Sequence, residues 1–160
     1  MSHFFSLYLF IYLFLSLCLS FLLLHSTPST PFVSLFRFVN NIDEYMVAAS
    51  LVVTKAGPGT IAEAAAVGLP VLLTSYLPGQ EAGNVDVVLE EGFGDFSKDP
   101  KTIAELTSAW LRDDDLMISM SKCAEKCARP DAAKDIATTI YEDAEANRVE
   151  MESKGLRRYV

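Results

Sequence analysis

Two short stretches of this sequence carry residues that could bind a phosphorylated sugar. In the first, Lys55–Thr60 (KAGPGT), two glycines follow an apolar run and precede a helix-forming segment. Glycine lets backbone N–H groups approach an anion, and the start of the following helix adds its positive end. Gly57 and Gly59 therefore predict a diphosphate site, but a tight turn from strand to helix would need the same glycines.

The second stretch, Pro78–Asn84 (PGQEAGN), places Gln80, Glu81 and Asn84 close together. If a helix begins near Glu81, the three side chains share its first turn. Amide and carboxylate groups bind the hydroxyls of a sugar well because they offer both donors and acceptors. The alternative interpretation is an exposed turn that leads into a capped helix.

Glu63, which follows Thr60 by three positions, has two interpretations. Thr60–Glu63 (TIAE) fits a capping box, in which the hydroxyl and the carboxylate each bind a backbone N–H of the helix start. Alternatively, the Glu63 carboxylate lines a ligand crevice and accepts hydrogen bonds from both hydroxyls of a ribose. The spacing alone leaves both interpretations open.

The segments around these stretches predict an α/β fold with a parallel sheet. Ser50–Thr54 and Pro70–Thr74 are continuous apolar runs, typical of strands buried on both faces of such a sheet. The helix predicted between them covers Thr60–Val67 and ends at Gly68. Because α/β folds place ligands at the carboxyl ends of their strands, the two polar stretches should lie together there.

The rest of the chain predicts further helices and one edge strand, which makes half of a doubly wound domain. The expected features are a short helix over Tyr45–Ala49, a helix over Asn84–Glu91, an edge strand at Gly92–Phe96, a helix capped by Asp99, a helix capped by Asp115, and a final helix from about Asp131 to Glu150 with Ile136, Ile140 and Tyr141 facing inward.

The charges exclude several kinds of site. The 13 Lys and Arg and 21 Asp and Glu residues, with a net charge of −8, all lie in residues 36–160. This acidic balance argues against a nucleic-acid surface, which needs a basic patch. Both histidines, His3 and His25, lie before residue 36. Residues 36–160 therefore cannot form a histidine triad, a histidine base or a histidine-containing zinc site.

A dinucleotide site competes with the sugar-nucleotide site. Gly57–Ala62 (GPGTIA) satisfies a G-x-G-x-x-A fingerprint after a strand. That use requires an acid at the end of the next strand, to bind the adenosine ribose. The next strand ends in Leu73–Ser75 (LTS), without an acid. We therefore favour the nucleotide sugar over NAD.

Residues 1–35 form an apolar segment and linker that we separate from a folded domain at residues 36–150 and a tail at residues 151–160. Phe4–Leu24 is long enough for the roughly 20 apolar residues that span a bilayer. It lacks the cationic start and the cleavage site of a secretory signal. Two interpretations stay open, a membrane anchor and translation of a pyrimidine-rich non-coding tract.

Taken together, the motifs resemble the C-terminal domain of the monogalactosyldiacylglycerol synthases, the plastid galactolipid synthases of glycosyltransferase family 28. The resemblance covers about Phe36 to Asp143. It is carried by Thr54–Ala64 (TKAGPGTIAEA), Gly68–Pro70 (GLP), Pro78–Asn84 (PGQEAGN), Phe96–Lys101 (FSKDPK) and Ala128–Ala132 (ARPDA).

The resemblance implies the C-terminal half of a GT-B glycosyltransferase, with a partial Rossmann-like sheet. In that family the C-terminal domain binds UDP-galactose, the N-terminal domain binds diacylglycerol, and galactose is transferred with inversion, without a cofactor or metal, at the plastid (chloroplast) envelope membrane. The resemblance implies these site residues: Gly57 and Gly59 at the diphosphate, Thr60 as helix cap, Glu63 at the ribose, and Gln80, Glu81 and Asn84 at the sugar.

The family's N-terminal domain and the first strands of its C-terminal domain have no counterpart in this sequence. We therefore expect a fragment that holds the donor site, lacks the acceptor-activating base and does not catalyse transfer by itself. The alternative is a non-catalytic nucleotide-binding or interaction module derived from such an enzyme. The motifs fit galactose and glucose donors equally.

Overall fold

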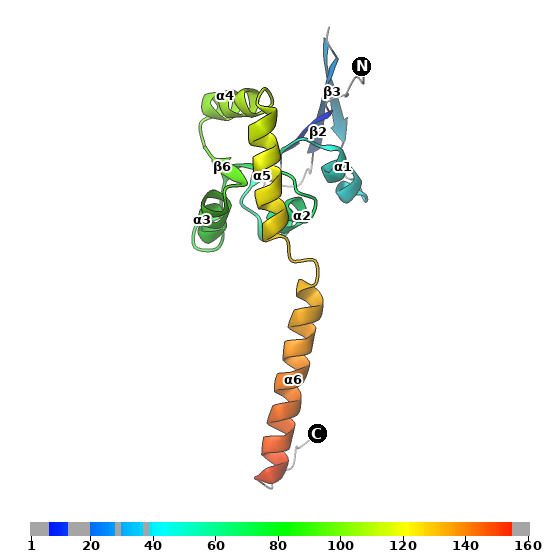
Figure 1. Ribbon diagram of the computed structural model, residues 1–160, viewed down its shortest axis with the longest axis vertical. Coiled ribbons are helices and arrows are strands. Elements are labelled where there is room, and N and C mark those ends of the chain that lie inside the picture. The colour runs from blue at the N-terminus through cyan, green and yellow to red at the C-terminus, as the bar shows by residue number, and fades with distance from the viewer. Residues whose placement is uncertain (1–6, 13–19, 28–29, 37–38, 155–160) are drawn as a thin grey trace. The chain divides into compact units, whose positions relative to one another are not determined.

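The computed structural model describes residues 7–12, 20–27, 30–36 and 39–154, with side chains from residue 39 onward (Figure 1). Parts of Phe4–Leu24 and of the 151–160 tail lie outside these ranges. The chain divides into two compact units, Met1–Ala128 and Arg129–Val160.

The first unit contains the predicted parallel sheet. Its strands are β4 (Val52–Lys55), β5 (Val71–Ser75) and β6 (Gly94–Phe96), in the order β4-β5-β6 with both pairs parallel. Helix α2 (Pro58–Ala66) connects β4 to β5, and α3 (Ala82–Glu91) connects β5 to β6. The predicted α/β class and the predicted edge strand at β6 are confirmed.

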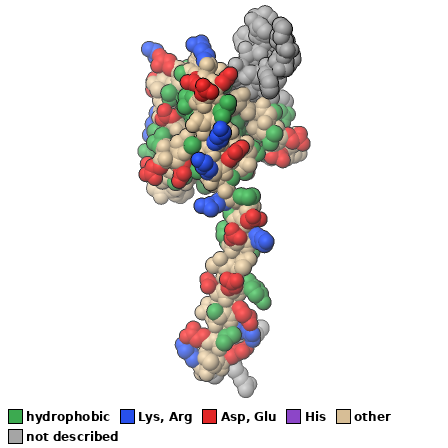
Figure 2. Space-filling model, in the orientation of Figure 1, with side chains coloured by type: hydrophobic (Ala, Val, Ile, Leu, Met, Phe, Trp, Pro, Cys, Tyr) green, Lys and Arg blue, Asp and Glu red, His purple; other side chains and the backbone are tan. Residues whose placement is uncertain are grey.

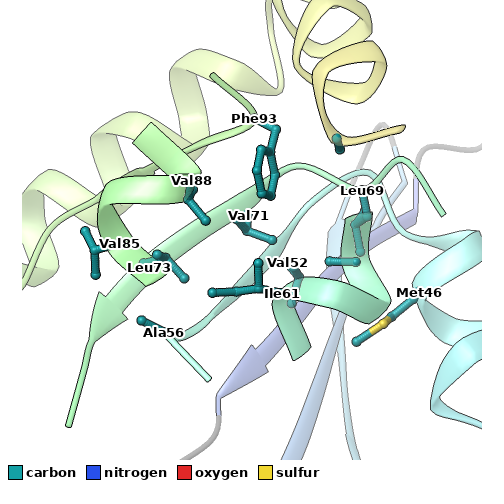
Figure 3. Packing of buried hydrophobic residues seen from close by; sticks show 12 residues of the cluster. Met46, Val52, Ala56, Ile61, Leu69, Val71, Leu73, Val85, Val88 and Phe93 are labelled. Atoms are coloured by element: carbon teal, nitrogen blue, oxygen red, sulfur yellow. The ribbon is translucent and has the colours of Figure 1, made fainter. Parts of the chain in front are cut away.

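Both faces of this sheet are buried, as the continuous apolar runs predicted. On one face, Val71 and Leu73 of β5 pack with Ile61 of α2 and with Val85 and Val88 of α3, and Figure 3 shows these side chains pointing toward one another. Alternate residues of the strands belong to a second cluster on the opposite face. That cluster contains Leu51, Val53, Leu72, Trp110 and Met120.

The second cluster is covered by helices α4 (Pro100–Trp110) and α5 (Asp114–Cys127). Asp99 caps α4 as predicted, because its carboxylate accepts the N–H of Thr102 at 2.8 Å. The predicted cap of α5 at Asp115 is wrong. Asp113 accepts the N–H of Leu116 at 2.9 Å, since it is the last non-helical residue before that helix.

Helix α2 ends at the predicted glycine. Gly68 has a φ of 66°, which side chains with a Cβ rarely adopt. Its N–H donates to the carbonyl of Ala65 at 3.0 Å, and the N–H of Leu69 donates to that of Ala64 at 2.8 Å. This pair of bonds is the Schellman motif, and it turns the chain directly into β5.

Before the parallel sheet, the chain forms a separate antiparallel sheet and a short helix. Strands β1 (Leu7–Tyr12), β2 (Ser20–Thr27) and β3 (Thr30–Phe36) pair in sequence order, and helix α1 (Ile42–Ala48) follows at the predicted place. The described part of Phe4–Leu24 is therefore strand. Among the described residues, no helix combines the length and the apolar character needed to cross a membrane.

The described part of the second unit is one helix, α6 (Ala132–Ser153), of 22 residues. The prediction that Ile136, Ile140 and Tyr141 face inward is wrong, because they are 60%, 63% and 71% exposed. The unit offers them no second described element to pack against. Figure 2 shows acidic and basic side chains along this helix. One pair is formed by Arg148 and Glu145, whose charged groups lie 2.6 Å apart.

Gly94 allows strand β6 to lie close to β5. A Cβ at this position would collide with the carbonyl oxygen of Val71 and lie 2.6 Å from Cγ1 of Val88. We expect Gly94→Ala to lower the free energy of unfolding by about 1–3 kcal/mol, the usual cost of overpacking. Urea unfolding followed by circular dichroism measures this change.

The matched control is Gly83→Ala in α3, where a Cβ would meet no atom within 4 Å. Alanine is the better helix former, so this variant should be at least as stable as the wild type. Equal stability of the two variants would contradict the close approach of β6 to β5.

Candidate functional site

The carboxyl edge of the parallel sheet brings the two predicted stretches together. The N–H of Ala56, directly after β4, donates to the carbonyl of Ser75, at the end of β5, at 2.7 Å. The side-chain amide of Asn84 donates through Nδ2 to the carbonyl of Ala56 at 2.9 Å. The backbone bond and the side-chain bond thus join residues that lie 19 and 28 positions apart in sequence.

An ion pair joins the same two stretches. Lys55 Nζ donates to Glu81 Oε1, and the other carboxylate oxygen of Glu81 accepts the N–H of Leu77 at 2.8 Å. The side chains of Lys55 and Glu81 are only 19% and 10% exposed. The second stretch is therefore held to the first through a charge that solvent barely reaches.

These contacts keep the Glu81 carboxylate ionised. The pKa of Glu81 lies below its ordinary value of 4.5. The main cause is the hydrogen bond from Lys55, followed by the hydrogen bond from the N–H of Leu77, whereas burial acts in the opposite direction. Hydrogen bonds to the charged form favour that form. Glu81 thus faces the Lys55 side chain as a carboxylate.

Lys55 is not among the site residues predicted from the sequence. The available signal was a lysine that comes directly after a buried strand and before a glycine turn. Such a residue must lie at the sheet edge where α/β folds bind ligands. Its partner Glu81 lies 26 positions away, so no pattern of neighbouring residues predicts the pair.

The first glycine stretch leaves room for a charged group. A Cβ at Gly57 would lie 3.1 Å from Lys55 Nζ, whereas a Cβ at Gly59 would meet no atom within 4 Å. Helix α2 starts at Pro58 with Gly57 as its N-cap, without a side-chain cap. Helix geometry leaves the N–H groups of Gly59 and Thr60 without partners inside the helix.

The predicted capping box is wrong, and so is the role of Thr60 as helix cap. Thr60 is the third residue of α2, because the fixed φ of Pro58 suits the first helical position and starts the helix earlier. Glu63 follows one turn later, exposed, and no hydrogen bond from another described residue reaches its carboxylate. The side chain of Glu63 is thus free to contact a ligand.

Glu81 and Asn84 lie at the start of α3, as predicted, whereas Gln80 precedes the N-cap residue and lies in the turn before the helix. Glu81 is its N-cap residue and Asn84 lies in its first turn. Both side chains already bind protein groups, namely Lys55, Leu77 and Ala56. Gln80 is exposed. The contacts of all three with a sugar stay predictions.

The chemistry available at this edge is binding of an anion that carries hydroxyl groups. It offers the ammonium of Lys55, backbone N–H groups at a helix start, the exposed carboxylate of Glu63 and the amides of Gln80 and Asn84. Within the described ranges, no three His, Cys, Asp or Glu side chains come together as they would around a metal ion.

The lowered pKa of Glu81 predicts a pH-dependent stability. A carboxyl whose pKa is lowered by folding stabilises the protein above its unfolded pKa, and this contribution is lost as the pH falls through the folded value. We expect Glu81→Gln to be about 1.5–3 kcal/mol less stable than the wild type at pH 7, the range for a hydrogen bond to a charged group. Below pH 4.5 this difference should shrink.

Urea unfolding at pH 7, 5, 4 and 3 measures the difference between the two proteins. If the difference is the same at all four values, Glu81 is not held as an anion by Lys55 and Leu77.

Comparisons with known proteins now identify the family. Residues 23–136 match the glycosyltransferase family 28 C-terminal domain, a match that begins before residue 36. The chain is 50% identical over 107 residues to a probable monogalactosyldiacylglycerol synthase, chloroplastic, of Nicotiana tabacum, covering 66% of this chain and 20% of that protein.

Two further relatives have a similar sequence identity to this chain. The monogalactosyldiacylglycerol synthase of Spinacia oleracea is 50% identical over 107 residues, again covering 66% of this chain and 20% of the relative. Monogalactosyldiacylglycerol synthase 1 of Arabidopsis thaliana is 45% identical over 107 residues, with the same two shares. The chain thus spans about one fifth of the length of these relatives.

Among solved structures, MurG of Acinetobacter baumannii is similar, with a TM-score of 0.59 and 20% identity, covering 67% of this chain and 33% of that one. This likeness shows the fold alone, which is that of the C-terminal half of a GT-B glycosyltransferase, and it confirms the predicted fold class. The family match covers most of the described sequence. The chain therefore belongs to glycosyltransferase family 28, of which it carries the C-terminal domain.

Proposed function

We propose that this domain binds the UDP part of UDP-galactose at the carboxyl edge of its sheet, as the donor half of a galactolipid glycosyltransferase. One observation carries the proposal: the two stretches that match the family lie together there, beside an uncapped helix start. The half-buried cation of Lys55 stands next to that helix start. Anions bind at such places because helix N–H groups and the helix dipole favour negative charge.

Each group then has a role in binding the donor. Gly57 and Gly59 admit the diphosphate to the start of α2, where Thr60 offers its backbone N–H. Glu63, exposed one turn further along, accepts hydrogen bonds from the ribose hydroxyls. A carboxylate can accept two of them at once.

The sugar lies toward the start of α3. Gln80 is exposed, and Asn84 keeps its carbonyl oxygen free for a hydroxyl while Nδ2 binds Ala56. The two oxygens of Glu81 each accept one hydrogen bond from the protein and retain capacity for a hydroxyl.

The proposed reaction is transfer of galactose to diacylglycerol with inversion. The acceptor hydroxyl attacks the anomeric carbon of galactose, and UDP leaves from the opposite side. Positive and dipolar groups around the diphosphate stabilise the negative charge that grows on the leaving group. UDP-galactose arrives already activated, so the proposal includes no cofactor.

The acceptor and its base belong to a part of the enzyme outside residues 36–160. A glycerol hydroxyl needs a general base near neutral pH, and this range contains no histidine. Diacylglycerol is a membrane lipid, so transfer takes place at a membrane surface. The relatives are named chloroplastic synthases of monogalactosyldiacylglycerol, which supports the plastid as location and galactose as the donor sugar.

The role of Glu63 is tested by Glu63→Ala. Loss of charge-assisted hydrogen bonds, about 1.5–3 kcal/mol, should weaken UDP binding about 10–100-fold. Because Glu63 is not a cap, the free energy of unfolding should change by no more than about 0.5 kcal/mol. Calorimetry with UDP and urea unfolding measure the two effects.

The matched control is Glu90→Ala, an exposed glutamate of α3, which should leave UDP affinity unchanged. Equal UDP affinity of wild type and Glu63→Ala would remove Glu63 from the ribose site.

Catalysis gives a second test. The full chain in detergent should bind UDP but form no galactolipid from radiolabelled UDP-galactose and diacylglycerol. Without a base and a positioned acceptor, it lacks general-base help of about 10²–10⁴-fold and the larger effect of proximity. Thin-layer separation of the lipids measures the product.

Galactolipid above the no-enzyme control would show that residues 36–160 contain the base, and Glu63 or Glu81 would have to supply it. A chain that binds no UDP would instead favour an interaction module.

A further inference from the structure

Lys55 stands between the two halves of the donor site. Its ammonium donates to Glu81 on one side and lies beside the turn at Gly57 on the other, where a Cβ would come within 3.1 Å of Nζ. An ammonium has three N–H donors, and Glu81 takes one of them. The remaining donors lie next to the turn that leads into α2.

Glu81 in turn fixes the second stretch. One carboxylate oxygen binds Lys55, and the other binds the N–H of Leu77 at 2.8 Å. The carbonyl of Leu77 accepts the N–H groups of Gln80 at 3.2 Å and of Glu81 at 3.0 Å. The turn from Leu77 to Glu81 is therefore attached to the rest of the site through the ammonium of Lys55.

We propose that Lys55 binds the diphosphate of the donor directly and, through Glu81, transmits its presence to the turn from Leu77 to Glu81. The proposal rests on the proposed function and adds a residue and a coupling to it. Phosphate oxygens occupy the free donors of the ammonium and restrict its rotation. An ammonium fixed in this way holds Glu81 and the turn that carries Gln80 more firmly.

The charge distribution supports a ligand on Lys55. The side chain is largely removed from solvent, and its one acidic partner is also the anchor of the turn. Nζ lies beside Gly57, the N-cap residue of the helix whose N–H groups at Gly59 and Thr60 would bind the donor diphosphate, and Gly57 places no side chain there. An ion pair that only stabilised the fold would not need a glycine beside the ammonium.

Comparing UDP with uridine shows whether Lys55 binds the diphosphate or only pairs with Glu81, because uridine keeps the ribose and base but lacks the diphosphate. For the full chain, calorimetry should show tighter binding of UDP than of uridine. Lys55→Met should weaken UDP binding about 10–100-fold, as expected for the loss of a charge-assisted hydrogen bond, and leave uridine binding unchanged.

The matched control is Lys101→Met. It removes the same charge from a side chain of α4 that is 84% exposed. Both affinities should stay at their wild-type values. An unchanged ratio of UDP to uridine affinity in Lys55→Met would overturn the proposal.

A second variant keeps the test valid if Lys55→Met fails to fold with Glu81 left unpaired. The double variant Lys55→Met/Glu81→Gln removes both charges and leaves no buried ion. Its ratio of UDP to uridine affinity should fall about 10–100-fold, as in Lys55→Met, while the affinity for uridine stays at the wild-type value. An unchanged ratio in this variant would exclude Lys55 as a diphosphate ligand.

The coupling has its own measurement in the amide hydrogen exchange of Leu77, whose N–H binds Glu81. In the wild type, UDP should slow this exchange more than uridine does at equal occupancy, and in Lys55→Met the two ligands should act alike. Equal slowing by both ligands in the wild type would overturn the coupling.

The outcomes also separate this inference from the proposed function. A wild-type chain that binds neither UDP nor uridine would contradict the proposed function and with it the role of Lys55. A chain that binds UDP equally well with and without Lys55 would contradict this inference alone.

Discussion

Burial of strands β4 and β5 on both faces constrains everything else in this domain. Val52, Val71 and Leu73 pack against one set of helices, and Leu51, Val53 and Leu72 pack on the opposite face. A strand buried in this way has no face on which a polar side chain could meet a ligand. Binding groups can therefore come only from the end of a strand, such as Lys55 as the last residue of β4, and from the residues that follow it, where the backbone leaves the sheet.

The proposed function requires that this edge attract an anion although the whole chain carries a net charge of −8. The overall field repels a nucleotide diphosphate, so binding depends on local donors. The Lys55–Glu81 pair is neutral as a unit, yet its ammonium is held at a defined place next to Gly57. In the proposed site, the position of this ammonium thus provides the attraction for a diphosphate that the net charge of the chain does not.

The sequence predicted the strands and the helices between them, because these follow from local apolar patterns. It also predicted that the two polar stretches meet, because the carboxyl ends of parallel strands lie at the same edge of a sheet. It failed where a single residue decides the outcome. Whether Asp113 or Asp115 caps α5, and whether Thr60 lies before or inside α2, depends on the residue at which the chain becomes helical. The inward face assigned to Ile136 and Ile140 failed for another reason, since apolar spacing says which residues share a face but not what covers it. Lys55 was missed because its partner is 26 positions away.

The early start of α2 changes the chemistry of the glycine stretch. With Pro58 in the first helical position, the backbone offers no N–H at that point, so an anion at this helix start meets the N–H groups of Gly59 and Thr60 with one donor fewer than usual. The ammonium of Lys55 lies beside the preceding residue, Gly57. In the proposed site the ammonium of Lys55 takes the place of the donor that proline removes, and the missing side chain of Gly57 leaves room for it. The same shift places Glu63 beyond the first turn of α2, so its carboxylate does not cap the helix.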